Sequence, residues 1–254
     1  MNELNEQVKE LKNSIFKITA NINDSESNNQ ILAFKKFVHM SLQISFKTFL
    51  DRYEFCGVSK EDNSPYSFKD YVSLGEEFLI FDDTDTPWSE YGIHKVMDSV
   101  QLYADIVKSH EPFTDVISAL ANEMGISTLT EKANYRTTYV PDEPCFFADL
   151  WAGYGALILE RIKKQYNDSR KSLKQLRVIA NDSEPLAANV VALQVLMNTI
   201  QHDIDIGAFT AYCSDLVVDW NDEKPFVISF KTPSCVFNTF DNIREEQLKN
   251  RGSN

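Results

Sequence analysis

The stretch Phe146-Phe-Ala-Asp-Leu-Trp-Ala-Gly-Tyr-Gly-Ala-Leu-Ile-Leu-Glu160 decides the fold that the sequence predicts. It opens with a short apolar strand over residues 146–149, and the residues from Gly155 to Tyr166 have the pattern of a helix. Gly153 and Gly155 stand between the two elements, and glycines allow a backbone to approach a ligand closely just before a helix N-terminus. The segment therefore predicts a strand, a ligand-binding turn and a helix.

The same alternation continues downstream. A second strand is predicted over Leu176–Ala180, and a second helix over Pro185–Thr199 with proline in its first turn. Third and fourth strands are predicted over Ile206–Tyr212 and Phe226–Phe230. Strands and helices that alternate at this spacing are typical of a parallel, doubly wound, Rossmann-like α/β sheet.

The first half of the chain has helical periodicity instead. A narrow apolar seam runs along the first helix, at Leu4, Val8, Leu11, Ile15 and Ile18. Further helices are predicted over Ile31–Tyr53, Ser89–Ser109 and Phe113–Met124. We therefore expect a helical N-terminal domain over residues 1–125 and an incomplete α/β domain over residues 126–254.

The apolar run Phe78–Phe81 is followed by Asp-Asp-Thr-Asp-Thr-Pro-Trp88. This order resembles a strand that leads into a DPPW-type catalytic loop, as in circularly permuted DNA methyltransferases. A short strand or helix edge and an Asx/Pro turn into the next helix explain the same residues, and the sequence favours that interpretation.

Charge and cysteine content limit the function classes. The 25 basic and 38 acidic residues give a net charge of −13, whereas a duplex-binding surface needs clustered cations. The single dense basic run, from Arg161 to Arg177, falls at a predicted helix C-terminus and the loop after it, where cations are favourable. The four cysteines form no close pair, so no zinc site is expected. The N-terminus is polar and has no leader pattern, which predicts a cytoplasmic protein. The sequence has no long apolar run, so no membrane segment is expected.

Acidic side chains follow three successive predicted strands. Asp149, Asp182 and Asp215 each stand at or just after the carboxyl end of a strand. The carboxyl ends of parallel strands meet at one edge, where nucleotide cofactors bind in open α/β sheets. Asp182 is placed to accept hydrogen bonds from a ribose diol, and Asp215 to meet an adenine amino group.

At these residues the chain resembles the N6-adenine DNA methyltransferases related to the modification subunits of type I restriction systems. Their cofactor loop, DPxCGTG, is similar to the segment Asp149–Gly155, which keeps the Asp and both glycines. Their second motif, an acidic residue followed by xxPLA and a helix ending in Asn, is matched closely by Asp182–Asn198. Glu111–Leu120 is similar to a helical segment of the family, and the resemblance spans roughly residues 110 to 235.

The resemblance implies S-adenosylmethionine as the cofactor, bound by Asp149, Gly153, Gly155, Asp182 and Asp215. Tyr139 and Pro141 match part of an FTP motif that covers the methionine end of the cofactor in the family. Leu150, Trp151 and Tyr154 replace proline or small residues of the family loop and are expected to narrow the mouth of the pocket.

The catalytic loop of the family follows the fourth strand and reads [DN]PP[YF]. Its polar side chain holds the adenine amino group, and its aromatic ring stacks on the flipped-out base. Here the matching residues are Thr232, Pro233, Ser234 and Cys235, which lack both groups. The resemblance therefore predicts a degenerate catalytic motif.

Few residues follow the fourth strand, so the remaining strands of a methyltransferase sheet and a target-recognition domain are not expected. An unpaired fourth strand exposes backbone donors and acceptors. Either the helical half, a protein partner or a second copy of the chain is expected to cover that edge.

Three functions remain open from the sequence. The first is an S-adenosylmethionine-dependent DNA adenine methyltransferase. The second is a non-catalytic relative that acts by binding, either as a phage- or plasmid-borne anti-restriction protein or as the partner subunit of a methyltransferase complex. The third is an α/β domain in which the glycine loop is only a tight turn.

Overall fold

The computed structural model describes residues 2–18, 26–75, 90–126, 146–216 and 226–251, and it has a mixed α/β fold. The described elements are, in chain order, α1 (Asn2–Phe16), α2 (Glu26–Phe55), α3 (Phe68–Tyr71), β1 (Val72–Leu74), α5 (Glu90–Ser109), α6 (Val116–Glu123), β2 (Phe146–Asp149), α7 (Ala156–Asp168), the 3₁₀ helix η2 (Arg170–Gln175), β3 (Arg177–Asp182), α8 (Pro185–His202), β4 (Ala208–Cys213), β5 (Phe226–Lys231) and α9 (Ser234–Arg251). Helices were predicted at α1, α2, α5, α6, α7 and α8, and strands at β2 to β5, so these predictions are confirmed.

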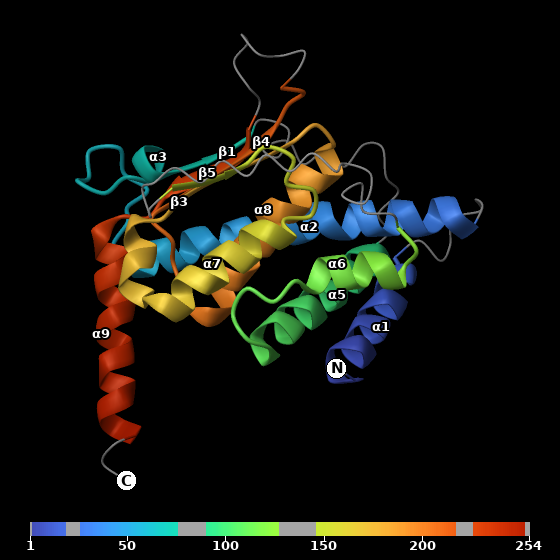
Figure 1. The fold of residues 1–254 in the computed structure, drawn as a ribbon, viewed down its shortest axis with the longest axis horizontal. Coiled ribbons are helices and arrows are strands. Elements are labelled where there is room, and N and C mark those ends of the chain that lie inside the picture. The colour runs from blue at the N-terminus through green and yellow to red at the C-terminus, as the bar shows by residue number, and fades with distance from the viewer. Residues whose placement is uncertain (1, 19–25, 76–89, 127–145, 217–225, 252–254) are drawn as a thin grey trace.

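The five described strands form one mixed sheet in the order β1-β5-β4-β3-β2. β2, β3 and β4 are parallel, β5 is antiparallel to β4, and β1 is antiparallel to β5. β1 consequently runs in the same direction as β2, β3 and β4. Figure 1 shows α2, α7 and α8 together on one side of this sheet.

The prediction of a parallel fourth strand is wrong, because β5 pairs antiparallel with β4. Only residues 214–225 separate the two strands, whereas a parallel pair needs a crossover that usually contains a helix. The strand order also runs from β2 through β5 without the reversal expected of a doubly wound sheet. Since β2, β3 and β4 follow one another across the sheet, connections of the usual right hand place α7 and α8 on the same face, as Figure 1 shows.

The edge of β5 is covered by the N-terminal half of the chain. Val72, Ser73 and Leu74 of β1 pair with Phe230, Ser229 and Ile228. The sequence left open whether the helical half, a protein partner or a second copy covers this edge. In the structure the N-terminal half covers it, through β1. The strand edge thus gives no reason to expect a partner or a second copy of the chain at this position.

Helix α8 lies between the sheet and the N-terminal helices. Every residue from Val190 to Thr199 is buried, which explains why its sequence is apolar on all sides rather than amphipathic. One face of α8 packs on β3 and β4, and the other contacts α2, α5 and α6. The buried apolar residues of both halves of the chain form one hydrophobic cluster.

The first helix packs within its own chain through its apolar seam. Val8, Leu11 and Ile15 are buried, and α1 contacts α2, α5 and α6. No helix in the described ranges is long and apolar enough to cross a membrane.

The C-terminal helix α9 was not predicted. It begins just after Pro233 and extends away from the rest of the fold (Figure 1). Val236 is its one buried residue, and Leu248 near its end is 63% exposed. With so little apolar surface, α9 carries almost no periodic signal in the sequence.

Candidate functional site

The candidate site is the edge of the sheet where the parallel strands β2, β3 and β4 end. Asp149 is the last residue of β2 and pairs with Ala180, so β3 continues to Asp182 beyond it. Asp182 pairs with Cys213 at the end of β4, and Ser214 and Asp215 follow directly. The structure therefore brings the three predicted carboxylates, Asp149, Asp182 and Asp215, to one edge.

The loop between β2 and α7 depends on its glycines. Gly153 and Gly155 have φ angles of 52° and 90°, in the left-handed region that favours glycine. A Cβ atom at Gly155 would lie 2.6 Å from Cγ2 of Val191, so the turn packs directly on α8. Both a ligand-binding loop and a tight structural turn need this geometry.

The Asp182 side chain ties this loop to the start of α8. Its Oδ2 accepts a hydrogen bond from the Gly153 amide at 2.8 Å, and its Oδ1 accepts one from the Glu184 amide at 3.0 Å. The residue is half-buried. A carboxylate has about four lone-pair positions, so these two bonds leave acceptor capacity for a further donor.

The neighbouring Asn181 organises the edge, a role that sequence analysis missed. Its buried Nδ2 donates to the carbonyls of Leu150 and Ser214, each at 3.1 Å, and its Oδ1 accepts from the Ser214 hydroxyl at 3.0 Å. Its own carbonyl accepts from the Ala152 amide at 2.9 Å. One amide side chain therefore joins the ends of β2, β3 and β4. The available signal was a polar residue directly after the apolar predicted strand Leu176–Ala180.

The three large residues of the loop do not behave alike. The Tyr154 side chain is buried, with its ring centroid 6.1 Å from that of Phe34 in α2. This burial, with smaller effects from Glu184 and Asp182, raises the pKa of Tyr154 to about 12. Trp151 is 45% exposed at the same edge. Tyr154 thus connects the loop to the helical half of the chain, and Trp151 is available to solvent.

Two amides on α8 hold the loop and the start of α6 together. Gln194 donates through Nε2 to the Tyr154 carbonyl at 2.8 Å and to Oδ1 of Asp115 at 2.9 Å. One turn later, Asn198 accepts from the Phe113 amide at 2.6 Å. Phe113 has a φ angle of 61°, unusual for a bulky residue, and this bond supports that conformation. The Asn that ends the matched motif therefore has a structural role.

The predicted catalytic segment is at the opposite end of the sheet. Lys231, the last residue of β5, pairs with Ala208, the first residue of β4. Thr232 to Cys235 therefore lie beside the amino ends of the parallel strands, and the Thr232 amide donates to Gly207. The Thr232 hydroxyl is buried between Tyr53 Oη at 2.7 Å and the Ile206 carbonyl at 2.7 Å. The expectation that this loop meets the predicted cofactor-binding edge is wrong, because β5 runs antiparallel to β4.

Tyr139 and Pro141 lie outside the described residues, so their predicted role stays a prediction. The run Phe78–Trp88 is also outside them. The strand that precedes it, β1, ends at Leu74 on the same edge as Asp182, because it runs parallel to β3.

Among the residues that the structure describes, no cluster of three or more His, Cys, Asp or Glu side chains is arranged to hold a metal ion. Comparisons of the chain with protein-family models, with curated proteins and with solved structures found no match. The case for a function therefore rests on the geometry of the sheet edge.

Proposed function

We propose that the chain is a methyltransferase-like protein that binds S-adenosylmethionine at the Asp182 edge and does not transfer a methyl group through the loop at Thr232. The observation that carries the proposal is the half-buried Asp182 carboxylate, which two backbone amides fix beside the glycine loop. The order β2-α7-β3-α8-β4 supports it as well, because these elements correspond to the cofactor-binding half of a Rossmann-like sheet.

The residues present fit the chemical groups of this cofactor. Asp182 keeps free acceptor positions for the two hydroxyls of a ribose. Gly153 has no side chain, so a ligand can approach the loop backbone closely. The N-terminus of α7 favours a negatively charged group such as the carboxylate of the cofactor. Asp215 is exposed at the next strand end, where an acceptor suits an adenine amino group. When bound, the cofactor supplies an activated methyl group.

The position of the segment Thr232–Cys235 supports the proposed lack of methyl transfer through this loop. Methyl transfer needs a group that holds the target nitrogen next to the cofactor. The Thr232 hydroxyl is instead committed to Tyr53 and Ile206 at the other end of the sheet. The proposed role is therefore binding, which corresponds to the non-catalytic relative among the functions that the sequence left open.

Isothermal titration with S-adenosylmethionine tests the cofactor site. We expect micromolar binding by the wild-type chain and a loss of about tenfold or more for Asp182→Ala and Asp215→Ala, since each removes a hydrogen bond to or from a charged group. Asp168→Ala is the matched control, because it removes an exposed carboxylate from the far end of α7. Asp215 is exposed, so its variant remains informative if Asp182→Ala unfolds the loop.

The absence of binding by the wild-type chain at millimolar ligand would refute the proposal. Equal affinity of all three variants would show that the ligand binds elsewhere. Incubation with methyl-labelled cofactor and unmethylated DNA tests the second half of the proposal. Label in the DNA would contradict a non-catalytic role.

A further inference from the structure

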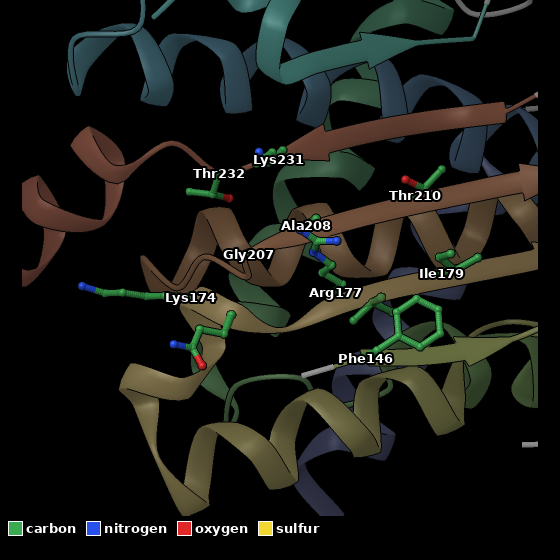
Figure 2. Close-up of a pocket in the computed structure, with 11 residues that line it drawn as sticks. Phe146, Lys174, Arg177, Ile179, Gly207, Ala208, Thr210, Lys231 and Thr232 are labelled. Carbon is green, nitrogen blue, oxygen red and sulfur yellow. The ribbon is translucent and has the colours of Figure 1, made fainter. Parts of the chain in front are cut away.

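The face of the sheet opposite α7 and α8 carries a pocket of about 580 Å³ at the amino ends of β3 and β4 (Figure 2). Strand residues on this face alternate with the buried apolar residues on the helix side, as the pleat requires. The described residues that line it are Phe146, Lys174, Gln175, Arg177, Val178, Ile179, Gly207, Ala208, Thr210, Lys231 and Thr232.

The pocket is positively charged in a chain that is acidic overall. Among the described residues of its lining, three are cations and none is a carboxylate. Arg177 and Lys231 occupy neighbouring positions across the sheet, because both pair with Ala208, one from each side. The guanidinium group of Arg177 in β3 and the ammonium group of Lys231 in β5 therefore lie on the same face of the sheet, with β4 between them.

Arg177 and Lys231 are available to a ligand, whereas Lys174 is not. Lys174 Nζ forms a salt bridge with Asp241 at 2.5 Å, and Figure 2 shows its side chain directed away from Arg177. Arg177 and Lys231 are exposed and have no salt bridge or side-chain hydrogen bond to any other described residue. The positive charge of these two residues is therefore not neutralised within the described fold.

A hydroxyl pair lies on the same face, one step further along the strands. Thr210 Oγ1 and Ser229 Oγ are 2.9 Å apart. Whichever of the two donates, the other keeps its own O–H hydrogen for a ligand. Phe146 and Ile179, both half-buried, add an apolar wall on the β2 side.

We propose that this pocket binds a small organic phosphate monoester. A phosphate dianion matches the charge of Arg177 and Lys231, which no described residue neutralises, and the planar guanidinium of Arg177 suits bidentate contacts with phosphate oxygens. The hydroxyl pair adds a neutral donor, and the wall of Phe146 and Ile179 suits an apolar organic group. The volume is in the range of pockets for small ligands.

A nucleic acid is the less favoured occupant. Its affinity grows with the number of phosphates neutralised, and among the described residues this pocket has two cations, Arg177 and Lys231, without a salt bridge. The net charge of −13 also repels an extended polyanion over the rest of its path. A single phosphate inside the pocket is affected mainly by the two cations in contact with it.

Titration calorimetry with phenyl phosphate tests the proposal, because this probe lacks the nucleoside recognised at the Asp182 edge. We expect binding by the wild-type chain, with phenol and inorganic phosphate each weaker. Arg177→Ala and Lys231→Ala should each weaken the binding by about ten- to a hundredfold, as expected for hydrogen bonds to a charged group. Arg177→Lys should retain part of the affinity, because it keeps the charge and loses the bidentate contact.

Lys164→Ala is the matched control, because it removes an exposed cation from α7 on the other side of the sheet. Asp182→Ala should also bind phenyl phosphate normally, so failure at one site is distinguishable from failure at the other. Unchanged affinity in both pocket variants would overturn the proposal, as would no binding of phenyl phosphate at millimolar concentration. Tighter binding of a single-stranded oligonucleotide that depends on Arg177 and Lys231 would also overturn it, in favour of a nucleic-acid surface.

Discussion

Replacing Gly155 with alanine tests the loop geometry on which the candidate site depends. The φ angle of 90° costs an L residue about 1–2 kcal/mol. The new Cβ would also lie 2.6 Å from Val191 Cγ2, inside the buried core of α8, and such overpacking costs about 1–3 kcal/mol. We therefore expect Gly155→Ala to reduce the free energy of unfolding by about 2–5 kcal/mol, the sum of these two effects.

The chain contains a matched control for the first of these costs. Gly57 has a φ angle of 93°, and a Cβ placed there meets nothing within 4 Å. Gly57→Ala should therefore cost only the backbone strain, about 1–2 kcal/mol. The change in unfolded-state entropy is the same in both variants, so the difference between them measures the contact with Val191.

Urea unfolding followed by circular dichroism gives both free energies. In the variant that combines Gly155→Ala with Val191→Ala the contact is relieved. We therefore expect it to be more stable than the sum of the single changes predicts, by about 1–3 kcal/mol. Equal destabilisation by Gly155→Ala and Gly57→Ala, together with additive behaviour of the double variant, would refute the packing of this turn on α8.

Other residues give four further tests. Asn181→Ala should lower the free energy of unfolding by about 2–4 kcal/mol, because it leaves buried carbonyls unpaired, and urea unfolding measures this. Arg52→Met should cost about 3–5 kcal/mol by leaving the buried Asp205 without its 2.7 Å salt bridge, whereas adding Asp205→Leu should recover most of the loss. Burial raises the pKa of Cys56 from 9.0 to about 11, so its neutral thiol contributes stability below pH 9.0 that is lost as pH rises through about 11. Unfolding curves at a series of pH values should therefore show a shallower alkaline loss for Cys56→Ala. Trp151 is exposed at the Asp182 edge, so its fluorescence should change with S-adenosylmethionine and not with phenyl phosphate, and no change with either would count against the cofactor site.

The sequence predicted the elements whose burial is periodic. β2, β3 and α7 have an apolar face of the right period, whereas α8 is a long apolar run that begins at Pro185, and the glycine and proline positions mark the turns between these elements. The convergence of Asp149, Asp182 and Asp215 follows in turn from parallel pairing of β2, β3 and β4.

The direction of β5 was not predictable from its own residues. The sequence pattern of a six-residue apolar strand is the same in a parallel and in an antiparallel pair. Which strand it pairs with depends on long-range packing. The partner strand β1 has only three residues, too short for a periodic signal. This single error moved Thr232 from the expected catalytic position to the opposite end of the sheet.

The roles of the side chains that hold the site together could also not be predicted from the sequence. Gln194 and Asn198 look like ordinary polar residues in an apolar helix until their partners in the β2–α7 loop and before α6 are known. Such bonds join residues far apart in the chain, and no local pattern specifies them.

The pairing of β1 with β5 has a consequence for synthesis on the ribosome. The two strands are separated by most of the chain, and β1 emerges long before β5. The newly made β5 therefore meets a partner strand that is already outside the exit tunnel, and its backbone groups are paired as soon as it folds. If the two halves were in the reverse order, β5 would be made before β1 and its edge would stay unpaired until β1 emerged. Unpaired strand edges can associate with other chains. We therefore expect the chain order to shorten the time during which the β5 edge is unpaired.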